Sequence, residues 1–300
     1  MARGLPVFLF VAAFLAALSA PGQEEKAGEP DVRIAAPIST KPLLEAVAQA
    51  MKRESGLQIA VTASLTSLDA LEALAEKKVD IAFLTKPLTG DQRAQYPELE
   101  LVVVPIGMEV VALGVSNDLW DAGVHTISQK NMRAIYEQKI TNWSQIGGPN
   151  EKLSLFSFEQ GGGVWEILAD WLYGDNRKAP FPKVDNMATS QDARDTLEFT
   201  PGAIVPLGAG FVDGARCHAL GLDLPKGIAR PAAEDIASGS YPIVRPINAV
   251  VVGRPILATR AVTEFLTGPA GQALVKRSGA LGLEAVPKAP ADPFFESLTK

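Results

Sequence analysis

Three short polar turns are the positions where this sequence could do chemistry, because each lies between a β-rich segment and an amphipathic helical pattern. The turns are Ser39–Thr40, Ser64–Ser67 and Gly161–Gly163. The first amide groups of a helix have no partners within the helix and lie at the positive end of its dipole, so they can hold a small anion. Adjacent glycines let a ligand approach the main chain closely. The pattern predicts an anion site built from local dipoles. The alternative is that each turn only caps its helix.

The elements that must position these turns alternate between β-rich runs and helical patterns, which indicates an α/β fold. Strands are expected at 32–35, 57–62, 79–84, 152–158, 203–207 and 247–252, and helices after the first two strands, at 131–138, after Gly163 and at 261–277. Leu101–Val115 is expected to form two consecutive strands, because Pro105 and Gly107 interrupt it. Ligands of open α/β sheets bind at the carboxyl ends of strands, which is where the three turns are expected to lie.

The composition predicts a globular protein, and the N-terminal segment predicts that it is exported. The 300 residues allow two domains or one large one, and 47% hydrophobic residues suffice for a sizeable core. A net charge of −6 gives no reason to expect a nucleic-acid partner. Arg3 and the apolar run 5–18 predict a signal peptide over 1–20, followed by a disordered lead-in over 21–31. We expect a periplasmic or secreted protein with no stable membrane insertion after cleavage, and a retained membrane anchor is the alternative.

The residue types that most often carry catalysis or bind metals form no recognisable set. His125 and His218 are the only histidines, and Cys217 is the only cysteine, so the sequence has no internal disulfide and no repeated zinc-ligand spacing. No GxSxG, HExxH, GxxxxGK[ST] or GxGxxG motif occurs. We therefore expect no enzymatic activity, no metal and no cofactor. A buried thiol and a surface histidine account for Cys217 and its neighbour.

Five segments carry a resemblance to a known family, and they occur in the family's order. They are VDIAFLTKPL at 79–88, AIYEQKITNWSQIGG at 134–148, TPGAIVPLG at 200–208, IASGSYPIVRPI at 236–247 and FLTGPAGQALVKRSGALGL at 265–283. These segments resemble phosphate-type substrate-binding proteins of ABC importers. The resemblance implies a type II periplasmic-binding-protein fold, with mixed sheets flanked by helices in two lobes and a cleft between them. The implied lobes are 32–112 with 245–290, and 113–244, with crossings near 110–115 and 241–246.

The resemblance also implies a set of ligand-binding residues. These are Ser39, Thr40, Ser67, Thr85, Lys86, Gly161, Gly162 and Gly163. The family's arginine, serine, glycine and threonine of the third loop fall on Phe158, Gly162, Gly163 and Val164. The strongest anion anchor is therefore missing, a loss of about 1.5–3 kcal/mol. Lys86 and Lys41 are candidate substitutes for it. The carboxylate of Glu159 next to this loop favours a protonated oxyanion as the ligand.

Together these observations predict an exported solute-binding protein that closes over a small oxyanion, first of all phosphate, by hinge motion. Its partner would be the permease of an ABC importer, and the family's usual state is a monomer. Three outcomes stay open: phosphate bound by a rebuilt site, a less charged ligand, or an unused cleft in a sensor or interaction protein. An exported hydrolase on a similar scaffold is a further alternative, although no nucleophile and base can be nominated for it.

Overall fold

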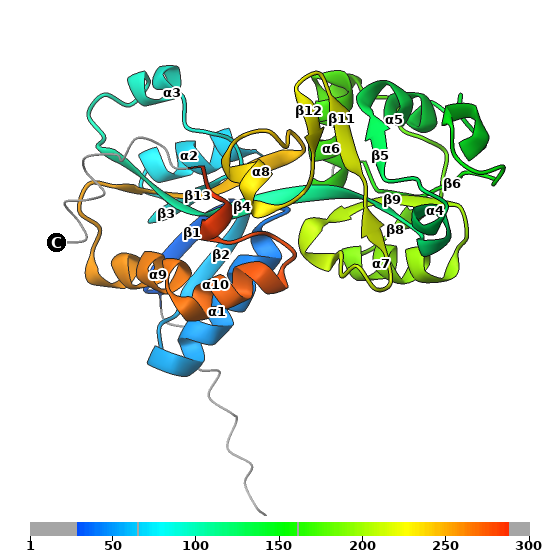
Figure 1. Cartoon of the computed structure of the whole chain (residues 1–300). Helices are drawn as coiled ribbons and strands as arrows, with labels where there is room; N and C mark the ends of the chain where they lie inside the picture. The colour runs from blue at the N-terminus through cyan, green and yellow to red at the C-terminus, as the bar shows by residue number, and fades with distance from the viewer. Residues whose placement is uncertain (1–28, 65, 161, 288–300) are drawn as a thin grey trace, which may run out of the picture.

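The computed structural model of the protein describes residues 29–64, 66–160 and 162–287. These residues form two groups of helices and strands that lie side by side (Figure 1). The predicted signal peptide, most of the predicted lead-in and Gly161 lie outside the described residues. Within the described ranges, no helix is long and apolar enough to cross a membrane.

The first group contains three parallel strands in the order β2-β1-β3, which continues through β13 to β4. Its elements are β1 (Val32–Pro37), α1 (Lys41–Ser55), β2 (Ile59–Ser64), α2 (Ser67–Ala75), β3 (Ile81–Leu84), α3 (Gly90–Ala94), β13 (Val244–Val252), α9 (Leu257–Thr267) and α10 (Pro269–Arg277). Strand β1 pairs in parallel with both β2 and β3. The loops after these strands therefore share one edge of the sheet.

Helix α1 illustrates how the sequence builds these elements. Its apolar residues recur three or four positions apart, so that Leu44, Val47 and Met51 lie on one buried face. Pro42 lies in the first turn, where a missing amide leaves no hydrogen bond unmade. Gly56 ends the helix with a φ of 76°, in the left-handed region that favours glycine. The helix begins directly after Ser39 and Thr40, as the sequence predicts.

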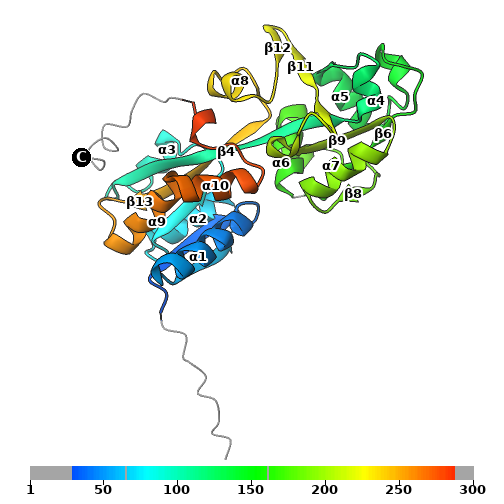
Figure 2. The ribbon, with the colours of Figure 1, turned by 60° about the horizontal axis from the view of Figure 1, so that its bottom comes forward.

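Strand β4 (Leu101–Val115) runs through both groups of elements (Figure 2). It pairs with β13 up to Val110 and with β9 (Ala203–Gly208) from Val111 onward. The prediction of two consecutive strands is therefore wrong. A shift of register opposite Ile247 and Asn248 leaves Ile106 without a paired residue, and this bulge lets one strand continue past Pro105 and Gly107.

The second group of elements is built from short strands and helices around a separate core. Its elements are α4 (Asn117–Asp121), β5 (Thr126–Ser128), α5 (Gln129–Tyr136), η1 (Trp143–Ile146), β6 (Ser154–Leu155), β7 (Ser157–Phe158), α6 (Gly163–Tyr173), η2 (Asn176–Lys178), β8 (Asn186–Met187), α7 (Ser190–Phe199), β9, η3 (Ala209–Phe211), β10 (His218–Ala219), β11 (Gly221–Leu224), β12 (Gly227–Ala229) and α8 (Ala233–Ala237). The 3-10 turn η4 (Leu283–Ala285) packs against β4. The expected strand over 152–158 is two short strands, since β6 pairs with β9 and β7 pairs with β8.

The other departures from the expected elements are small. The single helix expected over 261–277 is divided into α9 and α10, because Gly268 has extended backbone and Pro269 starts a new first turn. The second and third strands begin two residues later than expected. Element ends are the least certain part of any pattern-based assignment, since terminal residues carry little of the periodic signal.

Candidate functional site

The loops after β1, β2 and β3 bring the predicted hydroxyl residues to one edge of the first sheet. Ser67 and Thr85 form a pair, because the Thr85 amide donates a hydrogen bond to Ser67 Oγ at 3.0 Å. The Thr40 hydroxyl donates to the Pro37 carbonyl oxygen at 3.0 Å and so closes the turn after β1. The Ser39 hydroxyl instead accepts a hydrogen bond from the other end of the chain, 206 residues away. Its donor is Arg245 Nη2, at 2.8 Å.

The start of α6 approaches the same point from the second group of elements. Gly162 is the residue before the helix, and Gly163 is its first residue. A Cβ atom placed on Gly163 would lie 2.8 Å from Arg245 Nη2 and 2.9 Å from Ser39 Cβ. Only glycine therefore fits here without displacing its neighbours. The N-terminal ends of α1 and α6 thus meet at Arg245, which brings two positive helix ends to one place.

Arg245 is held by two carboxylates besides Ser39. It lies directly opposite Glu109 in the pairing of β13 with β4, and its Nε atom donates a hydrogen bond to the Glu109 carboxylate. Its Nη1 atom donates to Glu166 Oε2 at 3.1 Å. The Arg245 side chain is 13% exposed, whereas those of Glu109 and Glu166 are 19% and 36% exposed. Burial alone would lower the pKa of Arg245, but the two carboxylates outweigh it and raise this pKa.

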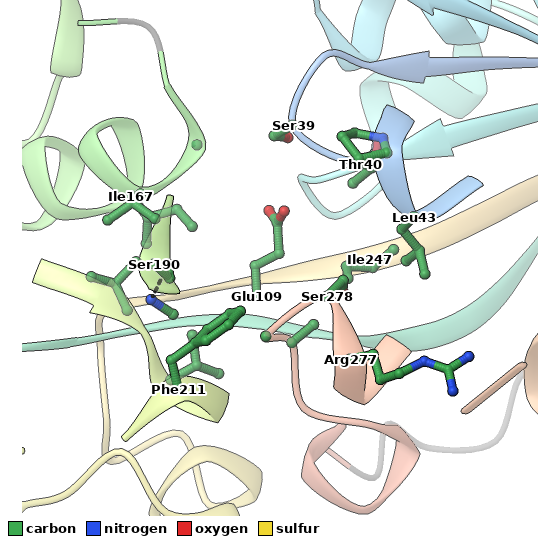
Figure 3. Close-up of a pocket in the computed structure, with 18 of the residues that line it drawn as sticks. Ser39, Thr40, Leu43, Glu109, Ile167, Ser190, Phe211, Ile247, Arg277 and Ser278 are labelled. Carbon is green, nitrogen blue, oxygen red and sulfur yellow. Dashed lines mark hydrogen bonds between the residues drawn. The ribbon is translucent and has the colours of Figure 1, made fainter. Parts of the chain in front are cut away.

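A cavity of about 500 Å³ lies beside this ion-pair cluster, between the two groups of elements. Figure 3 shows Glu109 projecting from β4 into it, with Ser39 and Thr40 on one side and Ile167 on the other. The Arg277 guanidinium, although it belongs to a lining residue, points away from the cavity. At its polar end the cavity is lined by Ser39, Glu109 and the first residues of α1 and α6, and Ser190 and Ser278 are polar lining residues elsewhere. Arg245 does not line the cavity itself but bonds to Ser39 and Glu109 at this end.

The structure brings some of the predicted site residues together and leaves others apart. Ser39, Thr40 and Gly163 line the cavity, whereas Ser67, Thr85 and Lys86 do not, and Lys86 is exposed. Gly162 precedes α6 without lining the cavity, and Gly161 lies outside the described residues.

Arg245 is the residue that sequence reasoning missed. Arg245 lies in the segment 236–247 and in the crossing predicted over 241–246, but no residue pattern there marks it as part of the site. Phe158, which the resemblance aligns with the family's arginine, is only 9% exposed, packs in the core of the second group and does not line the cavity. Glu159 is exposed, so the carboxylates beside the site are those of Glu109 and Glu166.

The two histidines pack on one tryptophan, and neither they nor Cys217 line the cavity. The rings of His125 and His218 pack against Trp120, with ring centroids 4.3 and 4.4 Å from the Trp120 centroid. Among the described residues, no group of three or more His, Cys, Asp or Glu side chains could hold a metal ion. Cys217 is fully buried, and burial raises the pKa of its thiol, which disfavours the reactive thiolate.

Two α/β groups joined by long crossing strands, with a cavity lined from both sides, define the class of two-lobed binding proteins. A family model described as a PBP superfamily domain matches residues 19–269, and the chain belongs to this superfamily. This agrees with the family resemblance and the fold expected from the sequence.

Two curated relatives carry the same description. The chain is 26% identical over 251 residues to the "Phosphate-binding protein PstS" of Bacillus subtilis (strain 168), which covers 83% of this chain and 77% of the relative. It is 25% identical over 170 residues to the "Phosphate-binding protein PstS" of Borreliella burgdorferi, which covers 54% of this chain and 60% of the relative.

The solved structures that resemble the chain share its fold. An ABC-type phosphate transport receptor from Vibrio cholerae has a TM-score of 0.64 at 18% identity, covering 84% of this chain and 99% of that one. A possible phosphate binding protein from Planctomyces limnophilus has a TM-score of 0.69 at 16% identity, covering 86% and 93%. The two-lobed architecture expected from the sequence is therefore confirmed.

Proposed function

We propose that the protein is an exported binding protein that captures phosphate, or a closely related oxyanion, in the cleft between its lobes for an ABC importer. The observation that carries this proposal is that Ser39 and Gly163 lie next to the buried Arg245 guanidinium, at the point where the N-terminal ends of α1 and α6 come together. The names of the two curated relatives, both phosphate-binding proteins, support the same ligand. Binding and release for transport need no catalytic group.

In this proposal Arg245 supplies the charge that the third loop lacks. A guanidinium presents donors in a rigid fork that matches an oxyanion, and here it stands next to the hydroxyl of Ser39. An incoming anion would take the place of the Glu166 carboxylate, because Glu166 is the more exposed of the two partners of Arg245. Arg245 thus replaces Lys86 and Lys41 as the proposed substitute for the family's arginine.

The charge balance of the site favours a ligand that carries a proton. One guanidinium and two carboxylates give the cluster a net charge of −1. A fully ionised oxyanion would face the Glu109 carboxylate without a proton between them, whereas a protonated oxyanion donates a hydrogen bond to it. The hypothesis of a protonated oxyanion therefore stands, with Glu109 and Glu166 in the role first given to Glu159.

The proposed lobes are 32–112 with 245–290, and 113–244. The change of partner of β4 between Val110 and Val111 supports a boundary at this place. A signal peptide over 1–20 would direct the protein to the periplasm or the exterior. The proposed partner is the permease of an ABC importer, and the proposed state is a monomer.

Isothermal titration of the protein with phosphate, sulfate, molybdate and tungstate tests the proposed function. We expect phosphate to bind, and Arg245→Gln to weaken binding by about 10- to 100-fold, because a charge-assisted hydrogen bond contributes about 1.5–3 kcal/mol. Arg260→Gln is the matched control, since Arg260 forms an ion pair with Glu264 on the exposed side of α9. A folded protein that binds none of the four anions contradicts the proposal and favours the sensor or interaction protein.

A further inference from the structure

The cavity beside Arg245 is apolar over most of its wall. Beyond its polar end it is lined mainly by Leu43 and Ala46 on α1, by Val164 and Ile167 on α6, and by Phe211, with Ser190 and Ser278 as the polar exceptions. In Figure 3 the side chains of Leu43, Ile167 and Phe211 surround the space below the Glu109 carboxylate. Burying the apolar surface of a ligand against such side chains is favourable, whereas they donate no hydrogen bonds to the oxygens of an inorganic anion.

The cavity has room for a ligand larger than an inorganic anion. At roughly 30 Å³ for each water-sized group, the five non-hydrogen atoms of a phosphate ion fill at most about 150 Å³. The cavity holds about 500 Å³, a size in the range of pockets for small organic ligands. The volume is not simply a gap between lobes held apart, because Ser39, Gly163 and Arg245 are already in contact across the cleft.

We propose that the ligand of this site is an organic phosphate monoester with a compact apolar substituent. This inference rests on the proposed function, since the phosphoryl group would occupy the polar end of the cavity. A singly protonated monoester keeps three phosphoryl oxygens, one that carries the proton donated to Glu109 and two that accept hydrogen bonds from Arg245 and Ser39. Its fourth oxygen leads the substituent into the space lined by Ile167 and Phe211.

Isothermal titration with inorganic phosphate and with phenyl phosphate, under the same conditions, compares two ligands that differ by one apolar ring. We expect phenyl phosphate to bind at least about tenfold more tightly, because the ring buries apolar surface against α1 and α6. Glycerol phosphate has a polar substituent of similar length, and it is expected to bind more weakly than phenyl phosphate.

Two variants locate the substituent. Ala46→Phe places a ring in the cavity from α1 and is expected to abolish the advantage of phenyl phosphate while inorganic phosphate binds as before. Ala48→Phe is the matched control, because Ala48 is half-buried on the same helix and does not line the cavity. Phe211→Ala removes part of the apolar wall without placing a new side chain in the cavity and is expected to reduce the advantage severalfold. It keeps the test valid where Ala46→Phe does not fold.

Each result decides between this inference and the proposed function. The inference is supported if phenyl phosphate binds more tightly than inorganic phosphate and Ala46→Phe abolishes this difference. This holds also if inorganic phosphate itself does not bind. If inorganic phosphate binds and phenyl phosphate binds no better, the inference is overturned and phosphate capture stands. If neither compound binds to the folded protein, both are overturned. The position assigned to the substituent is also overturned if Ala46→Phe weakens the binding of both compounds equally while Ala48→Phe leaves both affinities unchanged.

Discussion

Arg245 is the residue on which the polar groups of the site depend. Its guanidinium joins β13 to β4 through Glu109, to α6 through Glu166, and to the loop after β1 through Ser39. Taking a cation out of water is costly unless it is paired, and here three acceptors satisfy it. The same pairing means that a ligand anion competes with an internal carboxylate.

Glu166→Gln is expected to raise the affinity for phosphate about two- to fivefold, as measured by isothermal titration. The substitution removes the negative charge that competes for Arg245 Nη1, and partly exposed ion pairs of this kind contribute about 0.2–1 kcal/mol. Glu264→Gln, in the exposed pair with Arg260, is the control and should leave the affinity unchanged. Unchanged or weaker binding in Glu166→Gln would show that the Glu166 carboxylate does not occupy the ligand's place.

The sequence predicts only some of the individual residues of the site. The turn pattern pointed to Ser39 and Gly163, because hydroxyls and glycines before a helix carry a local signal. Arg245 has no such signal, since its partners Ser39 and Glu166 lie 206 and 79 residues away along the chain. A cation recruited through tertiary contacts can be located only when the strand that carries it has been placed against its neighbours.

At the scale of elements, the sequence predicts the α/β alternation well but not the continuity of long elements. Helix α1 and the strands after it follow from periodic apolar residues, which are local information. Strand β4 was expected to break at Pro105, and the bulge that lets it continue depends on its partner β13. The division between α9 and α10 has a local cause in Gly268 and Pro269, which the helical periodicity concealed.

The close packing of α10 on α9 depends on Gly271. A Cβ atom on Gly271 would collide with the Phe265 carbonyl oxygen and lie 2.6 Å from Leu266 Cα, and both are backbone atoms that cannot move away alone. We expect Gly271→Ala to lower the free energy of unfolding by about 1–3 kcal/mol in urea denaturation. Gly90→Ala is the matched control, because no atom lies within 4 Å of a Cβ there and α3 should be unaffected or slightly stabilised. Equal stability of the two variants would contradict this packing.

The loop before β10 should give the protein a measurable dependence of stability on acid. The Arg216 amide donates to the Asp213 carboxylate at 2.8 Å, and this bond, more than the Ala215 amide and the Arg216 guanidinium, lowers the pKa of Asp213 to about 2. An unfolded aspartate has a pKa of about 3.9. A lowered pKa stabilises the fold above the unfolded value, and this contribution is lost as the pH falls from about 4 towards about 2.

Asp213→Asn tests this dependence in urea denaturation at several pH values. The wild type should be the more stable protein at about pH 6, and the difference from the variant should shrink as the pH falls below about 4. A difference that stays constant over this range would mean that the Asp213 charge does not contribute to stability.

At the scale of the whole molecule, the Arg245 cluster links the two groups of elements that β4 and β13 join. Ser39 belongs to the first group and Glu166 to the second, and Arg245 bonds to both. In two-lobed binding proteins the lobes move as rigid bodies about their crossing segments. An ion-pair link across the cleft therefore favours the closed arrangement before any ligand arrives, and a ligand must replace part of this link.

Small-angle X-ray scattering of the ligand-free protein tests this consequence. We expect Arg245→Gln to increase the radius of gyration, because the ion-pair link is then lost and, besides the crossing strands, the contact of Gly210 with Gly279 is left to hold the two groups together in the absence of ligand. Arg260→Gln should scatter like the wild type, since its ion pair lies within α9. Thermal unfolding of both variants, followed by circular dichroism, separates opening of the cleft from loss of structure. If folded Arg245→Gln scatters like the wild type, the cluster does not hold the lobes together, and closure depends on the crossing strands, on other contacts such as that of Gly210 with Gly279, or on the ligand.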